Sequence, residues 1–160
     1  MTDFADLRDG GRRLAPLLAP LLSQSPLVLA VMPNGVPVAA GLREVIDVDV
    51  RGLPVTRSAD GAVAEPVEGI EGRLVIVVDD GVETGTVARA AAAALRPLGP
   101  ARLVLAVPVC SREAMSDLAL RYDEVLAPVT PMGRRALTWH YAMFDTIDDE
   151  TARSVLERLS

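Results

Sequence analysis

The sequence contains no lysine: all 16 of its basic residues are arginine. A Walker A nucleotide loop needs a lysine on the phosphates, and Schiff-base catalysis needs a lysine amine, so both kinds of site are excluded. Acidic residues number 22, and the formal net charge is −6 at pH 7. A nucleic-acid-binding surface needs clustered cations, so this charge balance argues against such a partner.

Cysteine and aromatic residues are also scarce. The single cysteine, Cys110, cannot form an intrachain disulfide or a thiolate metal cluster, which favours a reducing compartment. One tryptophan, two tyrosines and two phenylalanines offer little surface for stacking on nucleobases. No apolar run reaches the roughly 18 residues of a membrane span, and the first residues lack the layout of a signal peptide. We therefore expect a cytoplasmic protein with no nucleic-acid or membrane partner.

Aliphatic residues, in contrast, are abundant. Half of the 160 residues are hydrophobic, enough to fill the core of a single domain over residues 1–160. Short apolar runs predict buried strands, and one alternating segment predicts a strand with one polar face. These strands are expected at residues 27–32, 45–50, 74–78, 103–109 and 122–127.

Helical patterns alternate with these strands. They are expected at residues 3–22, either continuous or broken near Gly10 and Gly11, at 36–44, at 87–95, after a cap at Ser111, and at 148–159. This alternation predicts an α/β fold, a three-layer sandwich with a central parallel sheet of about five strands. Residues 51–73 are rich in glycine, proline and acids, and we expect a loop or a small hairpin there.

The most informative segment is residues 74–87, Leu-Val-Ile-Val-Val-Asp-Asp-Gly-Val-Glu-Thr-Gly-Thr-Val. Five apolar residues predict a strand buried on both faces, and it runs directly into Asp79 and Asp80. A glycine-spaced turn with two threonine hydroxyls then leads into an alanine-rich helix. Backbone N–H groups of such a turn and of a helix N-terminus bind anions. The segment therefore predicts an anion site with two carboxylates at its edge.

Other polar residues follow the neighbouring strands. Ligands of parallel α/β sheets bind beyond the carboxyl ends of the strands, so residues at these ends are expected to lie together. Paired aspartates there can hold Mg²⁺, bind the vicinal hydroxyls of a ribose, or act as acid and base. Alternatively, one aspartate caps the helix and the other is solvated. The other strand ends carry Pro33-Asn34-Gly35, Cys110-Ser111 and residues 128–135.

The run Val-Val-Asp-Asp-Gly-Val-Glu-Thr-Gly-Thr at residues 77–86 resembles the phosphoribosyl-pyrophosphate signature of the type I phosphoribosyltransferases. The Pro-x-Gly turn at residues 33–35 is similar to the family's pyrophosphate loop, which is usually Pro-Arg-Gly-Gly in one bacterial subgroup. The opening segment with Phe4, Asp6 and Arg8 and the tail at residues 145–156 also resemble that subgroup. The likeness covers most of the chain outside residues 51–73, and it identifies the chain as a short member of the subgroup.

What the resemblance implies is Mg²⁺-dependent transfer of a phosphoribosyl group to or from a nitrogenous acceptor. Asp79 and Asp80 would bind the ribose hydroxyls, directly or through Mg²⁺. Glu83 would assist proton transfer at the acceptor, or it is simply an exposed loop residue. The 5′-phosphate loop would comprise Gly81, Val82, Thr84, Gly85 and Thr86, and the pyrophosphate loop Met32, Pro33, Asn34 and Gly35. The resemblance also implies a small-molecule phosphoribosyl ligand and a homodimer.

Two features depart from the family's pattern. Asn34 stands where the subgroup usually has an arginine, so a cation near the pyrophosphate is missing; such a charge-assisted contact is worth about 1.5–3 kcal/mol. Residues 51–73 form only a reduced hood or loop where the family places a flexible lid. Arg51, Arg57 or Arg73 could supply the charge, or could be solvated.

These departures leave three functions open. The first is a phosphoribosyltransferase. The second is a non-catalytic domain that binds phosphoribosyl pyrophosphate or a nucleotide for regulation, with its lid and pyrophosphate loop degraded. The third is hydrolysis of a phosphorylated sugar at the same site. The cluster of Trp139, His140 and Tyr141 could line a base pocket or belong to the packing.

Overall fold

The computed structural model describes residues 2–133 and 135–160. Its centre is a five-stranded sheet in the order β2-β1-β5-β6-β7, in which every neighbouring pair is parallel. The strands are β1 (Leu27–Val31), β2 (Asp49–Leu53), β5 (Leu74–Val78), β6 (Arg102–Ala106) and β7 (Glu124–Leu126). The expected parallel sheet of about five strands is thus confirmed.

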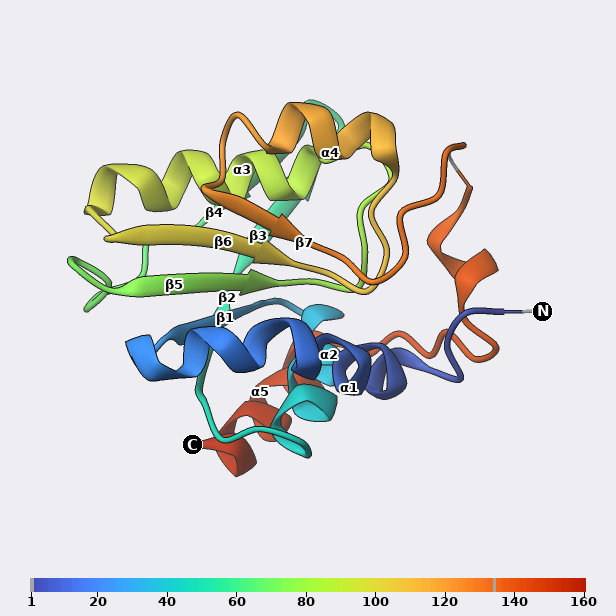
Figure 1. The fold of residues 1–160 in the computed structure, drawn as a ribbon, viewed down its shortest axis with the longest axis horizontal. Helices are drawn as coiled ribbons and strands as arrows, with labels where there is room; N and C mark the ends of the chain where they lie inside the picture. Colours follow the sequence, from blue (N-terminus) through green and yellow to red (C-terminus); the bar gives the residue numbers. More distant parts are fainter. Residues whose placement is uncertain (1, 134) are drawn as a thin grey trace.

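Helices cover both faces of this sheet, which gives the expected three-layer α/β sandwich (Figure 1). On one face lie α1 (Leu7–Leu18), α2 (Gly35–Arg43) and α5 (Asp149–Leu159), and on the other α3 (Thr86–Leu95) and α4 (Arg112–Leu118). Short 3₁₀ helices are formed by Ala19–Gln24 (η1), Arg96–Leu98 (η2) and Leu137–His140 (η3). None of the helices in the described part of the chain is long and apolar enough to cross a membrane.

The central strands are buried on both faces. Along β1, Val28 and Ala30 join the apolar cluster beneath α1 and α2, whereas Leu27, Leu29 and Val31 join the cluster beneath α3. The same alternation holds along β5. Because side chains and helices cover both faces of the sheet, we expect a polar ligand to bind beyond the carboxyl ends of the strands.

Helix α1 runs without a break through its two glycines, so of the two expected forms the continuous one is correct and the broken one is wrong. A Cβ atom on Gly11 would lie 1.8 Å from the Val38 carbonyl oxygen of α2, and one on Gly41 would lie 2.0 Å from the Arg8 carbonyl oxygen. The glycines therefore let the backbones of α1 and α2 approach closely. Tertiary packing here outweighs the poor helix propensity of glycine.

The second predicted strand was also misplaced, because β2 covers Asp49–Leu53 rather than residues 45–50. Pairing with β1 begins where Asp49 lies opposite Leu27. Before that point Val48 packs into the core, while Val45 is 56% exposed. Strands β6 and β7 are likewise shorter than the apolar runs that predicted them.

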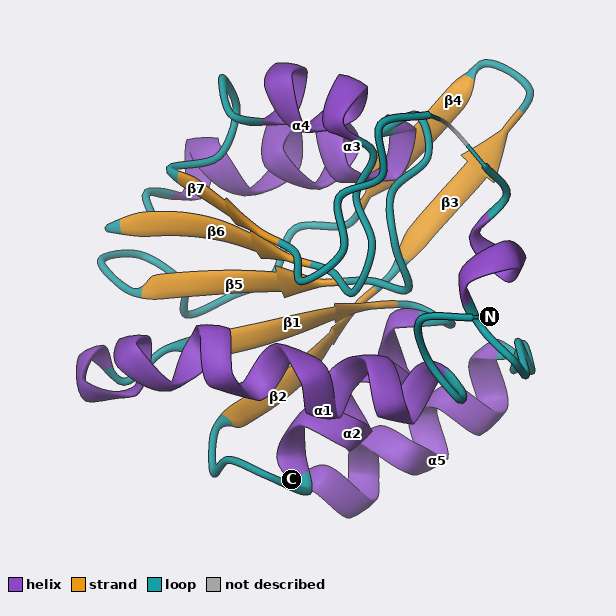
Figure 2. Ribbon diagram, turned by 45° about the vertical axis from the view of Figure 1, so that its right-hand side comes forward, coloured by secondary structure: helices purple, strands orange, loops and turns teal. Residues whose placement is uncertain are grey.

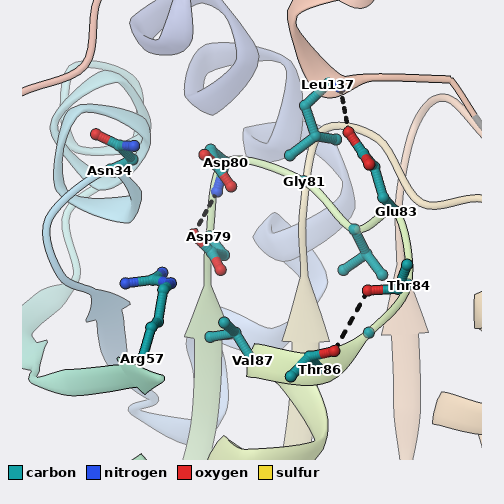
Figure 3. Close-up of a pocket in the computed structure, with 12 residues that line it drawn as sticks. Asn34, Arg57, Asp79, Asp80, Gly81, Glu83, Thr84, Thr86, Val87 and Leu137 are labelled. Atoms are coloured by element: carbon teal, nitrogen blue, oxygen red, sulfur yellow. Dashed lines mark hydrogen bonds between the residues drawn. The ribbon is translucent and has the colours of Figure 1, made fainter. Parts of the chain in front are cut away.

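Residues 55–64 form the small hairpin that was one of the two expectations for this region. Strands β3 (Val55–Ser58) and β4 (Gly61–Ala64) pair antiparallel and form a separate two-stranded sheet. Strand β4 packs against α3, and Ala64 is buried there (Figure 2). The hairpin places Arg57 of β3 near the carboxyl end of β5 (Figure 3).

The N-terminal residues lie along the segment after η3. Phe4 forms a parallel bridge with Tyr141, and the rings of the two residues are 5.3 Å apart. The His140 imidazole Nδ1 lies 2.7 Å from a carboxylate oxygen of Asp3. These contacts hold residues 137–143 against the carboxyl end of the sheet.

Candidate functional site

A cavity of about 430 Å³ opens at the carboxyl end of β5. Its walls combine the predicted acid pair and phosphate loop with residues from three other segments (Figure 3). The lining residues are Asn34, Arg57, Asp79, Asp80, Gly81, Val82, Glu83, Thr84, Gly85, Thr86, Val87 and Leu137. All eight residues from Asp79 to Thr86 that were predicted as site residues therefore lie around one cavity.

The two aspartates line this cavity where β5 ends. Asp79 is 8% exposed, and its Oδ1 atom accepts a hydrogen bond of 2.8 Å from the Asp80 backbone N–H. Burial raises the pKa of Asp79 well above its ordinary value, and the charge of Asp80 raises it further. Burial also raises the pKa of Asp80, while the hydrogen bond with Asp79 and the charge of Arg57 lower it.

A bound cation would offset the cost of burying the charges of Asp79 and Asp80 side by side. Two buried carboxylates repel each other, and a divalent cation between them favours their ionised forms. In the described residues no group of three or more His, Cys, Asp or Glu side chains surrounds a point, so the protein offers no complete metal cage. Mg²⁺ commonly binds through one or two carboxylates and takes its other oxygens from water and phosphorylated substrates. The donor set fits that mode of binding.

The loop after the acids has the geometry of an anion site. Gly85 has φ +90°, a left-handed conformation that favours glycine, and it is the N-cap of α3. The Thr84 and Thr86 hydroxyl oxygens lie 3.4 Å apart, and both side chains are exposed. Backbone N–H groups in the first turn of α3 lack helical partners and point the same way. A phosphate here would meet N–H donors, two hydroxyls and the positive end of a helix.

Hydrogen bonds from neighbouring segments hold this loop in place. The Val82 N–H donates to the Val109 carbonyl at 2.8 Å, and the Ser111 hydroxyl donates to the Glu83 carbonyl at 3.1 Å. The guanidinium of Arg89 donates to the Thr84 carbonyl at 2.9 Å. Ser111 also caps α4 as predicted, by accepting from the Ala114 N–H. The loop is thus held in shape by contacts on the side away from the cavity.

Glu83 bridges the loop to a distant segment. Its Oε1 atom accepts a hydrogen bond of 2.7 Å from the backbone N–H of Leu137, the first residue of η3. Figure 3 shows the Glu83 carboxylate directed at Leu137. In this structure, therefore, the carboxylate is occupied by a backbone donor.

The predicted pyrophosphate loop contributes to the cavity through Asn34. Its Oδ1 atom accepts from the Ile147 N–H at 3.3 Å, which ties the start of α2 to the C-terminal segment. The Met32 side chain is buried in the core. A Cβ atom on Gly35 would lie 2.6 Å from the Val78 carbonyl oxygen, so glycine lets α2 begin directly beside the end of β5. Pro33 follows a cis peptide bond in the turn before α2.

Of the three candidate arginines, only Arg57 lines the cavity. Arg51 donates to the Glu68 carbonyl, and Arg73 donates to the Ser25 carbonyl and lies 3.8 Å from Asp49. The charge of Arg57 lowers the pKa of Asp79 and Asp80 against the effect of burial. In Figure 3, Arg57 and Asn34 lie on one side of the acid pair, with Glu83 and Leu137 on the other.

Sequence reasoning missed Leu137 and Val87 as lining residues. Val87 directly follows the predicted loop, whereas Leu137 lies in a segment for which no element was predicted. The nearby Trp139-His140-Tyr141 cluster does not line the cavity. Its histidine and tyrosine are buried, and Trp139 is half-exposed beneath the Arg135 guanidinium.

Known proteins resemble this chain in sequence and in fold. No family model matches the sequence. Two Mycobacterium tuberculosis proteins, named putative phosphoribosyl transferases, are 28% identical to it over 207 aligned residues. The alignment covers 97% of this chain but only 46% of each relative, so the chain spans about half their length. The alignment is also longer than the chain, so the relatives carry residues within the matched region that this chain lacks.

Solved structures extend the comparison to the fold. The Thermus thermophilus protein TT1426 superposes with a TM-score of 0.86 at 28% identity, over the whole of both chains. A purine phosphoribosyltransferase from Pyrococcus horikoshii has a TM-score of 0.59 at 17% identity, over 84% of this chain and 97% of the other. A hypoxanthine-guanine phosphoribosyltransferase from Bacillus anthracis has a TM-score of 0.58 at 20% identity, over 79% and 77%. The chain is thus similar in sequence to proteins named putative phosphoribosyl transferases, and it shares its α/β fold with purine and hypoxanthine-guanine phosphoribosyltransferases.

Proposed function

We propose that the protein is a phosphoribosyltransferase that binds phosphoribosyl pyrophosphate together with Mg²⁺ and transfers the phosphoribosyl group to a nitrogenous acceptor. One observation carries the proposal. The buried carboxylate of Asp79 and the partly buried carboxylate of Asp80 line the same cavity as an anion loop at the N-terminus of α3. This combination matches a ligand with vicinal hydroxyls next to a phosphate.

The 5′-phosphate is assigned to the loop between Gly81 and Thr86. There the Thr84 and Thr86 hydroxyls and the backbone N–H groups would donate to the phosphate oxygens. The ribose would then extend across Asp79 and Asp80, whose carboxylates accept hydrogen bonds from its hydroxyls. The carboxylates of Asp79 and Asp80 would also hold Mg²⁺, which would supply electrostatic stabilisation of the leaving pyrophosphate.

The pyrophosphate is assigned to the side of the acid pair where Asn34 and Arg57 lie. Arg57 comes from the β3–β4 hairpin rather than from the loop in which the subgroup usually has its arginine. Its guanidinium can donate two parallel hydrogen bonds to phosphate oxygens. We therefore propose that Arg57 supplies the positive charge near the pyrophosphate that the neutral Asn34 cannot supply.

The chemistry is a displacement at the anomeric carbon. A bond forms between that carbon and the acceptor nitrogen, the bond from that carbon to the pyrophosphate oxygen breaks, and the proton that the acceptor nitrogen loses passes to solvent. Positive charge develops on the sugar in an oxocarbenium-like transition state, and the fixed carboxylates of Asp79 and Asp80 stabilise it. The bond to the leaving group breaks on the side of Arg57, so the acceptor approaches from the opposite side.

A non-catalytic domain that only binds the sugar phosphate is the second candidate. The observation that favours it is the short β3–β4 hairpin, Val55–Ser58 and Gly61–Ala64, which occupies the region of the family's lid. A small hairpin closes a site less completely, and water competes with the acceptor in an open site.

Turnover separates the two candidates. Purified protein is incubated with Mg²⁺, phosphoribosyl pyrophosphate and a panel of purine, pyrimidine and simple amine acceptors, and release of pyrophosphate is followed. Acceptor-dependent release that is lost in Asp79→Asn with Asp80→Asn supports the transferase. Binding of phosphoribosyl pyrophosphate without release on any acceptor supports the binding domain. Release that does not depend on an acceptor indicates hydrolysis.

A further inference from the structure

The contact between Glu83 and Leu137 joins two walls of the cavity that are far apart in the sequence. The Leu137 N–H stands at the first turn of a 3₁₀ helix, where backbone donors have no helical partner. Glu83 supplies the acceptor at 2.7 Å. A charged acceptor makes such a bond shorter and stronger than a neutral one.

The side chain of Leu137 rests on the backbone of the phosphate loop. A Cβ atom on Gly81 would come within 2.6 Å of Leu137 Cδ2, so glycine is needed for this close approach. Gly81 also has φ +151°, which disfavours any side chain. The η3 helix is thus packed directly against the loop that Glu83 belongs to.

The same segment is attached to the loop at its other end. The Tyr141 hydroxyl donates to the Asp80 carbonyl at 2.6 Å. Residues 137–141 are therefore attached to the loop at two points, Glu83 and Asp80. We call residues 137–141 the cavity wall, although within this segment Leu137 alone lines the cavity and the residues after it support it from outside.

This wall lies on the acceptor side if the proposed function holds. Arg57 and Asn34 occupy the opposite side of the acid pair, where the pyrophosphate leaves. The acceptor attacks from the side opposite to the leaving group, which is the side of Glu83 and Leu137. Leu137 offers that acceptor an apolar surface.

We propose that Glu83 is a positioning residue: its carboxylate holds the cavity wall in place so that Leu137 packs against the acceptor. This inference rests on the proposed function, because only a transferase has an acceptor. It replaces the role of proton transfer that the family resemblance implied for Glu83. A positioning role requires an oxygen acceptor at this place, whereas proton transfer requires a group that titrates.

Two substitutions distinguish these roles. Glu83→Gln retains a carbonyl oxygen for the Leu137 N–H, and Glu83→Ala removes it. We expect Glu83→Gln to stay within about 10-fold of the wild-type kcat/KM, with an unchanged pH profile, because a neutral hydrogen bond replaces a charged one. We expect Glu83→Ala to lose more, mainly through a higher KM for the acceptor. Glu71→Ala, at an exposed position away from the cavity, is the control.

The only tryptophan of the sequence provides a readout that needs no ligand. Trp139 lies in η3, two residues after Leu137, and is 52% exposed. Its fluorescence therefore reports on the cavity wall. We expect acrylamide quenching of the ligand-free protein to rise in Glu83→Ala and to stay at the wild-type level in Glu83→Gln and Glu71→Ala. Far-UV circular dichroism verifies that each variant is folded.

The results decide between a positioning role and proton transfer for Glu83. If Glu83→Gln loses as much activity as Glu83→Ala and one limb of the pH profile disappears, Glu83 transfers a proton and the proposal is wrong. Unchanged quenching in Glu83→Ala also overturns it, because the wall then does not depend on this contact. If the wild type does not bind phosphoribosyl pyrophosphate, the proposed function fails, while the quenching comparison still decides whether Glu83 positions the wall.

Discussion

The Tyr141 hydroxyl donates a hydrogen bond of 2.6 Å to the backbone carbonyl of Asp80, 61 residues earlier in the chain. Tyr141 is 3% exposed, and the hydrogen bond is partly buried. Burial raises the pKa of the Tyr141 phenol, so the hydroxyl stays protonated and able to donate at any physiological pH. This bond fixes the peptide group between the acid pair and the phosphate loop.

Replacing Tyr141 with phenylalanine tests how far this bond supports the site. The Asp80 carbonyl would lose its donor, and we expect a loss of stability of about 1–3 kcal/mol together with weaker binding of ribose 5-phosphate. Stability is measured by urea denaturation and binding by calorimetry. The packing of the ring on Phe4 and Phe144 is retained in the variant, so the effect isolates the hydroxyl.

Tyr122→Phe is the matched control. The buried Tyr122 hydroxyl donates to the Ala88 carbonyl, also at 2.6 Å, but neither residue lines the cavity. We expect a similar loss of stability with unchanged binding. Equal binding losses in the two variants would show that the Tyr141 bond has no special relation to the site.

Asp79→Asn is expected to stabilise the protein at neutral pH while abolishing Mg²⁺-dependent binding. The raised pKa of Asp79 means that its ionised form is penalised in the folded chain. Asparagine removes that penalty and keeps an Oδ1 acceptor for the Asp80 N–H. Each kcal/mol recovered raises Tm by about 2–4 °C for a chain of this size.

The pH dependence of this difference follows from the sign of the shift. Below the ordinary aspartate pKa of about 3.9, the carboxyl is protonated in folded and unfolded chains alike and the variant has no advantage. As the pH rises through the raised pKa, the wild type loses stability and the variant does not. Thermal melts between pH 3 and 8 check this, and a gain of the wild type over the variant at neutral pH would contradict it.

Arg57→Ala should weaken binding of phosphoribosyl pyrophosphate far more than binding of ribose 5-phosphate. A charge-assisted hydrogen bond to a phosphate is worth about 1.5–3 kcal/mol, or roughly 10–150-fold in Kd. Calorimetry with both ligands measures the ratio. Arg51→Ala is the control, because Arg51 is bonded to the Glu68 carbonyl and does not line the cavity. Equal losses for the two ligands would place Arg57 away from the pyrophosphate.

The crossing of α1 and α2 depends on Gly11. An added methyl group would lie 1.8 Å from the Val38 carbonyl oxygen, so the two helices must separate. We expect Gly11→Ala to destabilise the protein by about 1–3 kcal/mol or more, although alanine is the better helix former. Gly133→Ala, where a methyl group would meet nothing within 4 Å, should be neutral. Denaturant midpoints compare the two, and a stabilised Gly11→Ala would contradict the packing argument.

Local chemistry explains what could be predicted from the sequence. Strand β5, the acid pair, the loop and α3 follow one another in the chain. Each is indicated by its own residues: an apolar run, two carboxylates, spaced glycines and a series of helix-forming residues. Ile46, Val48 and Val50 do alternate toward the core, as the sequence indicated. Only the bounds of the strand were predicted wrongly. Pairing with β1 starts at Asp49, and alternation alone does not fix where a strand begins.

The parts of the site that escaped prediction come from distant segments. Arg57 could be named only as one of three candidates, since nothing in its own hairpin shows that the hairpin folds toward Asp79. Leu137 lies in a short 3₁₀ helix with no periodic pattern, and its place is fixed by Glu83 and Gly81. The bond from Tyr141 to the Asp80 backbone likewise leaves no trace in the sequence, because its acceptor is a peptide carbonyl.

Calorimetric titration of the protein with phosphoribosyl pyrophosphate, with and without Mg²⁺, tests the proposed function most directly. The wild type is compared with the double variant Asp79→Asn with Asp80→Asn, whose fold is verified by its melting curve. We predict saturable binding that requires Mg²⁺ and is lost in the double variant. No binding to the wild type, or binding that the double variant retains unchanged, would contradict a phosphoribosyl site at Asp79 and Asp80.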